Sequence, residues 1–277
     1  MKSAPLAIVV RTAGTNCDRE TCMALERAGA KVELTHLYRL LEQPARLEAA
    51  SMVVFPGGFS YGDDVAAGRI QGFEVRQSLA PALFEFVAGG GFVLGICNGF
   101  QVLVDTGLLE GLPQAGKREV ALSSNVRGRF ECRWVHLINE DSRCTWLPAG
   151  RVWPVPIAHG EGRVMLRDDA VLERLKSERR IVLRYVRPDG TRATSADELE
   201  VCPNGSLDQI AGLCDLTGRI IGLMPHPERN ITPWHHPQWT RLSGTRTEGE
   251  GLDFYRRMVV AASQSAATRS GRIPTNA

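Results

Sequence analysis

Hydrophobic and polar residues form alternating blocks along the first part of the chain. Short apolar runs predict buried strands at residues 6–10, 31–34, 52–55 and 92–96. The segments between them have helical spacing and predict helices at 18–28, 79–88 and 100–109. Such alternation is typical of a parallel sheet with helices on both faces. We therefore expect an α/β fold with a mostly parallel central sheet.

The second part of the chain has a different pattern, with strands predicted at 129–137, 151–157, 181–186, 210–215 and 219–223. The last two flank Leu216-Thr217-Gly218, a typical hairpin turn, so these strands are expected to extend the sheet in antiparallel fashion. Residues 252–262 predict a closing helix, and the small, polar residues 263–277 predict a disordered tail. Because no repeat or linker divides the sequence, we expect one domain over residues 1–262.

A possible nucleophile lies between the strand at 92–96 and the helix that follows it. The segment Gly95-Ile96-Cys97-Asn98-Gly99 has the pattern and the context of a nucleophile elbow. Glycines on both sides remove side chains that would clash in so sharp a turn. A helix N-terminus favours thiolate at Cys97, and the Asn98 N–H can face an oxyanion. The alternative is a buried cysteine at the end of a core strand.

A candidate base follows the strand at 219–223, in Met224-Pro225-His226-Pro227-Glu228. In an extended segment the side chains of His226 and Glu228 project to one face, so Glu228 can hold the imidazole. Together with Cys97 they form a possible nucleophile–base–acid triad. Without the elbow, this segment would be interpreted as a surface loop.

A third element is the glycine pair in FPGGFSYGDD, which follows the strand at 52–55. A Gly-Gly turn lets backbone amides face a ligand without side-chain obstruction, so Gly58 N–H and Asn98 N–H can form an oxyanion hole. Considered alone, this segment is more often simply a turn.

Composition and charge narrow the choice of function. Lys and Arg number 33 against 31 Asp and Glu, which gives a net charge of +2 and no electrostatic footprint for nucleic acid or an anionic membrane. The seven cysteines are irregularly spaced without a C-x-x-C pair, which fits a reducing compartment. No apolar stretch is long enough to span a bilayer. We expect a cytoplasmic protein without membrane or nucleic-acid partners.

The three segments FPGGFSYGDD, GICNGFQ and MPHPE together resemble class I, triad-type glutamine amidotransferases. The resemblance implies a flavodoxin-like fold and L-glutamine as the substrate. It implies the following roles in this chain: a catalytic triad of Cys97, His226 and Glu228, oxyanion amides at Gly58 and Asn98, and substrate contacts at Gln101, Gly57 and Gly58.

Further segments, PIAHGEGR, PNGS, IAGL and GLMPHPER, resemble the glutaminase subunits of phosphoribosylformylglycinamidine synthase over residues 6–262. This implies glutamine hydrolysis through a Cys97 thioester, with ammonia passed to a separate synthetase subunit. That partner would use ATP and Mg to convert formylglycinamide ribonucleotide to formylglycinamidine ribonucleotide in purine biosynthesis. A small third subunit can join such complexes. The resemblance implies no metal or cofactor in this chain itself.

Several other features leave alternatives open. The loop 11–18 departs from the usual Phe-Pro-Gly-Ser of these subunits, and residues 232–251 have no assigned function. Residues 111–117 approach a Walker A loop but lack the hydroxyl that follows the lysine. His235 and His236 are adjacent and not expected to share a metal with His226. His159 is either a residue near the glutamine site or a loop histidine, and Cys17 is expected to be a core or loop thiol.

Two other function classes remain possible on the same motifs. A cysteine peptidase would share the elbow and the histidine, although GGFSYGDD and Gln101 favour glutamine. A non-catalytic binding module would have little need for Cys97, His226 and Glu228 together.

Overall fold

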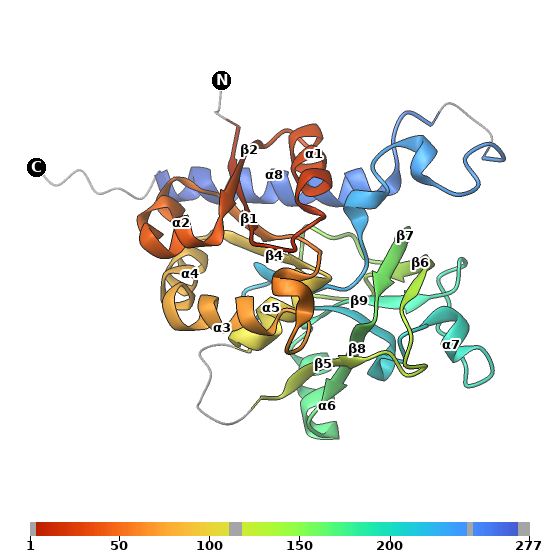
Figure 1. Cartoon of the computed structure of the whole chain (residues 1–277). Helices are drawn as coiled ribbons and strands as arrows, with labels where there is room; N and C mark the ends of the chain where they lie inside the picture. Colours follow the sequence, from red (N-terminus) through yellow and green to blue (C-terminus); the bar gives the residue numbers. More distant parts are fainter. Residues whose placement is uncertain (1–3, 111–117, 243–245, 271–277) are drawn as a thin grey trace, which may run out of the picture.

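A computed structural model describes residues 4–110, 118–242 and 246–270 of the chain. Within this part, one sheet contains nine strands in the order β2-β1-β3-β4-β11-β10-β9-β6-β7 (Figure 1). Their bounds, in chain order, are β1 Leu6–Arg11, β2 Lys31–His36, β3 Met52–Phe55, β4 Phe92–Ile96, β6 Glu131–Ile138, β7 Val152–His159, β9 Ile181–Val186, β10 Ile210–Cys214 and β11 Ile220–Leu223. A separate antiparallel pair joins β5 (Val120–Ser124) to β8 (Glu161–Leu166).

The first five strands in this order pair in parallel, and the remaining pairs are antiparallel. This confirms the predicted parallel sheet with an antiparallel extension. Every residue of β4 is buried, as expected for a strand covered on both faces, whereas burial alternates along β7 because one of its faces is less covered. The predicted hairpin between β10 and β11 is also present.

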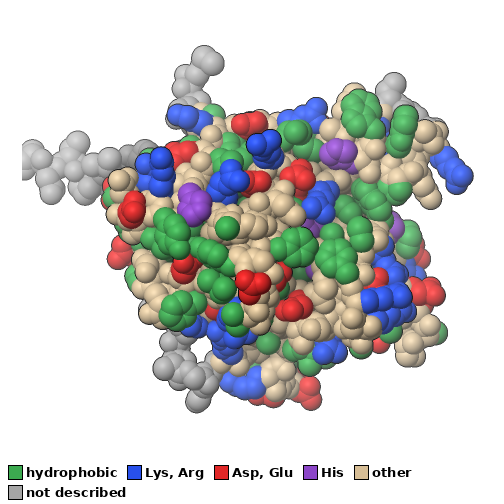
Figure 2. Space-filling view, in the orientation of Figure 1, with side chains coloured by type: hydrophobic (Ala, Val, Ile, Leu, Met, Phe, Trp, Pro, Cys, Tyr) green, Lys and Arg blue, Asp and Glu red, His purple; other side chains and the backbone are tan. Residues whose placement is uncertain are grey.

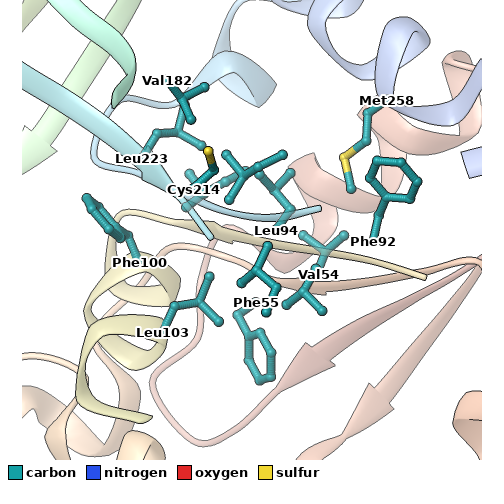
Figure 3. Close-up of a cluster of buried hydrophobic side chains, with 14 of the residues drawn as sticks. Val54, Phe55, Phe92, Leu94, Phe100, Leu103, Val182, Cys214, Leu223 and Met258 are labelled. Carbon is teal, nitrogen blue, oxygen red and sulfur yellow. The ribbon is translucent and has the colours of Figure 1, made fainter. Parts of the chain in front are cut away.

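Helices cover both faces of the parallel half (Figure 1). On one face α1 (Asp18–Arg27) packs against α8 (Glu250–Ser270), and on the other α5 (Asn98–Thr106) packs against α3 (Arg69–Ser78). Figure 3 shows the two core layers, with Phe100 and Leu103 on one side of β4 and Met258 beside Phe92 on the other. The other helices are α2 Leu37–Glu42, α4 Ala80–Ala88, α6 Asp169–Ser177 and α7 Glu198–Val201, with short 3-10 turns η1 Pro44–Ala49, η2 Ser60–Asp63, η3 Leu207–Gln209, η4 Pro227–Arg229 and η5 Pro233–His235.

The C-terminal prediction was wrong in part, because α8 continues through Ser270 rather than ending at Ala262. The Ser265 hydroxyl donates to Gly90 O at 2.7 Å, which ties this turn of the helix to the loop after α4. Alanines in the same segment also favour helix over coil. Residues 271–277 lie outside the described part.

The surface agrees with the balanced composition. On the face drawn in Figure 2, side chains of Lys and Arg are interspersed with those of Asp and Glu rather than gathered by sign. Among the described residues, no helix combines the length and apolarity that crossing a bilayer requires.

Candidate active site

Cys97 occupies a strained turn between β4 and α5. Its φ of +52° and ψ of −106° are unusual for a residue with a side chain, and its N–H donates to Leu223 O at 2.8 Å. A Cβ on Gly99 would lie 1.9 Å from Phe55 O, and one on Gly95 would lie 2.5 Å from Gly99 O. Both flanking glycines are therefore required by close backbone packing, as the elbow pattern predicts.

His226 reaches the same place because β11 pairs in parallel with β4, with Leu223 opposite Ile96. His226 Nδ1 lies 2.5 Å from Glu228 Oε1, and both side chains are buried. Pro227–Arg229 form the 3-10 turn η4, so the prediction of an extended segment was wrong. The turn nevertheless brings the carboxylate back onto the imidazole.

The electrostatics of His226 favour the imidazolium. Burial lowers its pKa, but Glu228, Cys97 and Cys17 together raise it well above the ordinary value. Because Nδ1 is bonded to Glu228, Nε2 is the nitrogen left for sulfur, and it has no other hydrogen-bond partner among the described residues. The arrangement suits a thiolate–imidazolium pair between Cys97 and His226.

Gly58 lies in the loop after β3, and Asn98 begins the helix after the neighbouring strand β4. Gly58 follows β3 with a φ of +149°, and a Cβ there would lie 2.8 Å from Thr15 Cα. Asn98 is the first residue of α5, so its N–H has no partner within the helix. The Asn98 side chain accepts from Ser60 N at 3.2 Å and donates to Asp63 Oδ1 at 3.2 Å, which ties the loop after β3 to the elbow.

A cavity of about 140 Å³ opens beside Cys97. Its lining residues are Gly58, Phe59, Asp63, Ala67, Cys97, Gln101, Phe130, Ala158, His159, Gly160 and Glu161. Gln101 is anchored because its Nε2 donates to Glu161 O at 2.5 Å and its Oε1 accepts from Asn98 Nδ2 at 3.0 Å. Gly57 does not line this cavity. It packs on His226 instead, where an added Cβ would lie 2.7 Å from Cε1.

His159 is the last residue of β7, and it is buried and lines this cavity, so it is not an exposed loop histidine. Burial, and after it the charge of His226, lower the pKa of His159 to about 3. Asn125 Nδ2 donates to two carbonyl oxygens, so its Oδ1 is the acceptor for His159 Nδ1–H at 3.1 Å. His159 is therefore a neutral histidine whose buried Nε2 has no partner among the described residues.

Sequence reasoning missed two parts of the site. Asp63 and Glu161 bring carboxylates to the cavity, and burial raises the pKa of Asp63. The thiol of Cys17 is buried beside His226 rather than in an ordinary core position. The SYGDD and HGEGR segments contain the two acids, but only the fold places them around one cavity.

The remaining candidates do not join the site. His235 Nδ1 accepts from Ile231 N and His236 Nδ1 accepts from Gln238 N, so both rings are engaged locally. His236 also packs on the Trp134 ring, with 5.1 Å between centroids. The Walker-like segment 111–117 lies outside the described residues.

A family model and two named relatives all match this chain over most of its length. The family model for the CobB/CobQ-like glutamine amidotransferase domain matches residues 4–260. A phosphoribosylformylglycinamidine synthase subunit PurQ from Dehalococcoides mccartyi is 42% identical over 93% of this chain and 97% of its own length. A PurQ subunit from Methanococcus maripaludis is 41% identical over 86% of this chain and 87% of its own length.

Solved structures also resemble the chain. The PurLQS structure from Thermotoga maritima contains a chain that is 30% identical, with a TM-score of 0.66 over 93% of this chain and 98% of that one. A glutamine amido transferase from Methylobacillus flagellatus is 12% identical with a TM-score of 0.51, over 99% and 98% of the two chains, and supports the fold alone.

Proposed function

The chain belongs to the glutamine amidotransferase family, among its PurQ members, and from this premise we propose how it hydrolyses glutamine to glutamate and ammonia. The observation that carries the proposal is the assembly of Cys97, on a strained elbow, with the buried His226–Glu228 pair beside one small cavity. Each residue then has a defined task.

The Cys97 thiolate attacks the carboxamide carbon of glutamine, forming a C–S bond. The N–H groups of Gly58 and Asn98 stabilise the negative charge that develops on the amide oxygen, a contribution typically worth about 10²–10³ in rate per donor. The His226 imidazolium gives its proton to the departing nitrogen as the C–N bond breaks. His226 then takes a proton from water, which attacks the thioester, and the C–S bond breaks to release glutamate. Glu228 keeps the imidazole oriented throughout.

The cavity favours free glutamine over a peptide. Asp63 and Glu161 contribute carboxylates that can pair with an α-ammonium group, which a glutamine within a peptide lacks. The side-chain amide of Gln101, whose oxygen and nitrogen are both hydrogen-bonded, can contact the α-amino and α-carboxyl groups of the ligand. A cysteine peptidase would need a groove for flanking residues, and the small cavity offers little room for them.

The second half-reaction belongs to a partner. We propose that the ammonia passes to a synthetase subunit that uses ATP and Mg to make formylglycinamidine ribonucleotide, in the cytoplasm and with a small third subunit in the complex. The names of the PurQ relatives and of the PurLQS structure support this assignment.

The test is glutamate release from glutamine by the complex of this chain with its synthetase partner. Cys97→Ala should abolish glutamine-dependent synthesis and leave ammonia-dependent synthesis intact, because the thiol serves only the first half-reaction. Cys132→Ala, at an exposed thiol, is the control and should retain both activities. If the unsubstituted complex releases no glutamate, the glutaminase assignment is wrong. Loss of both activities in Cys97→Ala would mean that Cys97 is structural.

A further inference from the structure

A second thiol, Cys17, lies at the N-terminal cap of α1 and is almost completely buried. Its sulfur accepts a hydrogen bond from Arg229 Nη2 at 2.9 Å and donates to Asn16 Oδ1 at 3.2 Å. Arg229 directly follows Glu228 in η4, and the two segments are 212 positions apart in sequence. The sulfur is thus held by a cation from the 3-10 turn that contains Glu228 and directly follows His226.

The Cys17 sulfur also adjoins the imidazole. Donor atoms of Cys17, His226 and Glu228 lie within 4.8 Å of one another. A Cβ on Gly57 would meet Cys17 Sγ at 3.1 Å and His226 Cε1 at 2.7 Å, so sulfur and ring share one wall. The backbone fixes this position, since Cys17 N–H donates to Gly57 O at 3.1 Å.

Three such donors could suggest a metal centre, but the Arg229 contact opposes it. A guanidinium 2.9 Å from the sulfur places a positive charge where a metal cation would have to bind. The Glu228 carboxylate is already committed to His226 Nδ1. A role in holding the imidazole agrees with both contacts.

We propose that Cys17 is a positioning residue: its sulfur, fixed by Arg229, supports the His226 imidazolium that pairs with the Cys97 thiolate. This inference rests on the proposed function. The charged and titratable groups around this cluster are Glu20 from α1, Cys97 from the elbow, His159 from β7, Glu228 and Arg229 from η4, and Tyr255 from α8. Of these, Arg229 is the group that contacts the Cys17 sulfur directly.

The direction in which loss of the Cys17 sulfur should change the pKa of His226 follows from the groups around the imidazolium. Burial lowers the pKa of His226, whereas Glu228, Cys97 and Cys17 raise it. Removing the Cys17 sulfur should let the imidazolium lose its proton at lower pH. The basic limb of the kcat/KM profile should therefore move to lower pH.

The experiment compares Cys17→Ala with Cys22→Ala in the complex with the synthetase partner. Cys22 is the matched control because it is a partly buried thiol five residues further along the same helix. Glutaminase kcat/KM is measured against pH for each. A second readout is the pH dependence of Cys97 alkylation by a chloroketone analogue of glutamine, which needs no partner. Cys17→Ala should shift the basic limb in both measurements, and Cys22→Ala should shift neither.

Cys17→Ser provides a second variant if Cys17→Ala fails to fold, and its shorter hydroxyl should give a smaller shift in the same direction. A rate loss with an unmoved basic limb, or no change at all, would overturn the proposal and leave Cys17 as a packing residue. Failure of the proposed function is a separate outcome, because then the unsubstituted complex itself would release no glutamate.

Discussion

The buried, neutral His159 predicts a specific dependence of stability on pH. Its pKa is about 3 in the folded chain, against 6.5 for an ordinary histidine. As pH falls below about 6.5, His159 becomes protonated in the unfolded chain but not in the folded chain. The free energy of unfolding therefore decreases progressively until the pH approaches the pKa of His159 in the folded chain. At about pH 5 the loss from this one residue is about 2 kcal/mol, since each unit of pKa difference corresponds to about 1.36 kcal/mol.

The perturbation is His159→Gln, and the assay is urea unfolding followed by tryptophan fluorescence at about pH 7.5 and about pH 5. Between these values the unsubstituted chain should lose about 2 kcal/mol more free energy of unfolding than the variant. The constant cost of losing the Asn125 hydrogen bond cancels in this difference. His226 contributes in the opposite sense, because its folded pKa is raised, but it is present in both proteins. His36→Gln controls for removal of a histidine at an exposed position.

Parallel pH profiles for the unsubstituted chain and His159→Gln would refute this reasoning. That result would mean that His159 binds its proton in the folded chain, so that burial beside His226 does not keep it neutral.

Two further predictions concern the triad and the elbow. Glu228→Gln should lower glutaminase kcat by about 10²–10⁴ with little change in KM, because it removes the charge that supports the imidazolium; an unchanged kcat would exclude Glu228 from the triad. Gly99→Ala should reduce the free energy of unfolding in urea by about 3 kcal/mol, since its Cβ would lie 1.9 Å from Phe55 O. Gly160→Ala is the control because its Cβ would meet only Phe130, at 3.8 Å, and equal stability of the two variants would contradict the packing argument.

Local sequence patterns correctly predicted the elements whose structure depends on residues that are contiguous in sequence. The uniform burial of β4, the hairpin after β10 and the turn at Cys97 follow from apolar runs and glycines that are contiguous in sequence. Helix α3 was missed for the converse reason. It contains Gly72, a poor helix former, which lies so close to α5 that a Cβ there would be 2.6 Å from Asp105 Cβ. Tertiary packing, rather than propensity, accounts for that helix.

Helix α6 was also not predicted, although the sequence contains a sign of where it begins. The helix begins at Asp169, and the carboxylate of the preceding Asp168 accepts from Val171 N at 2.9 Å, a standard N-terminal cap. The small β5–β8 sheet gave no comparable sign, because each strand is short and pairs only with a distant segment.

In the site, too, residues in recognisable short motifs could be predicted, whereas residues that depend on contacts between distant segments could not. Cys97 and His226 were identified from motifs, because an elbow and a proline-flanked histidine are recognisable in short segments. Cys17 could not be identified this way, because its contact with Arg229 depends on the register of strands far apart in sequence. A thiol at the start of a helix looks the same whether or not a guanidinium faces it.

The sheet explains why these pieces converge. Strands β1, β3, β4 and β11 run in parallel, so the loops that follow them, with Cys17, Gly58, Cys97 and His226, meet at one edge. The antiparallel extension completes the site from the other side, since Pro156 O of β7 accepts from His226 N at 2.9 Å although β7 is last in strand order. Catalytic geometry in this chain therefore depends on strand register across both halves of the sheet, and neither half alone contains the whole triad and its cavity.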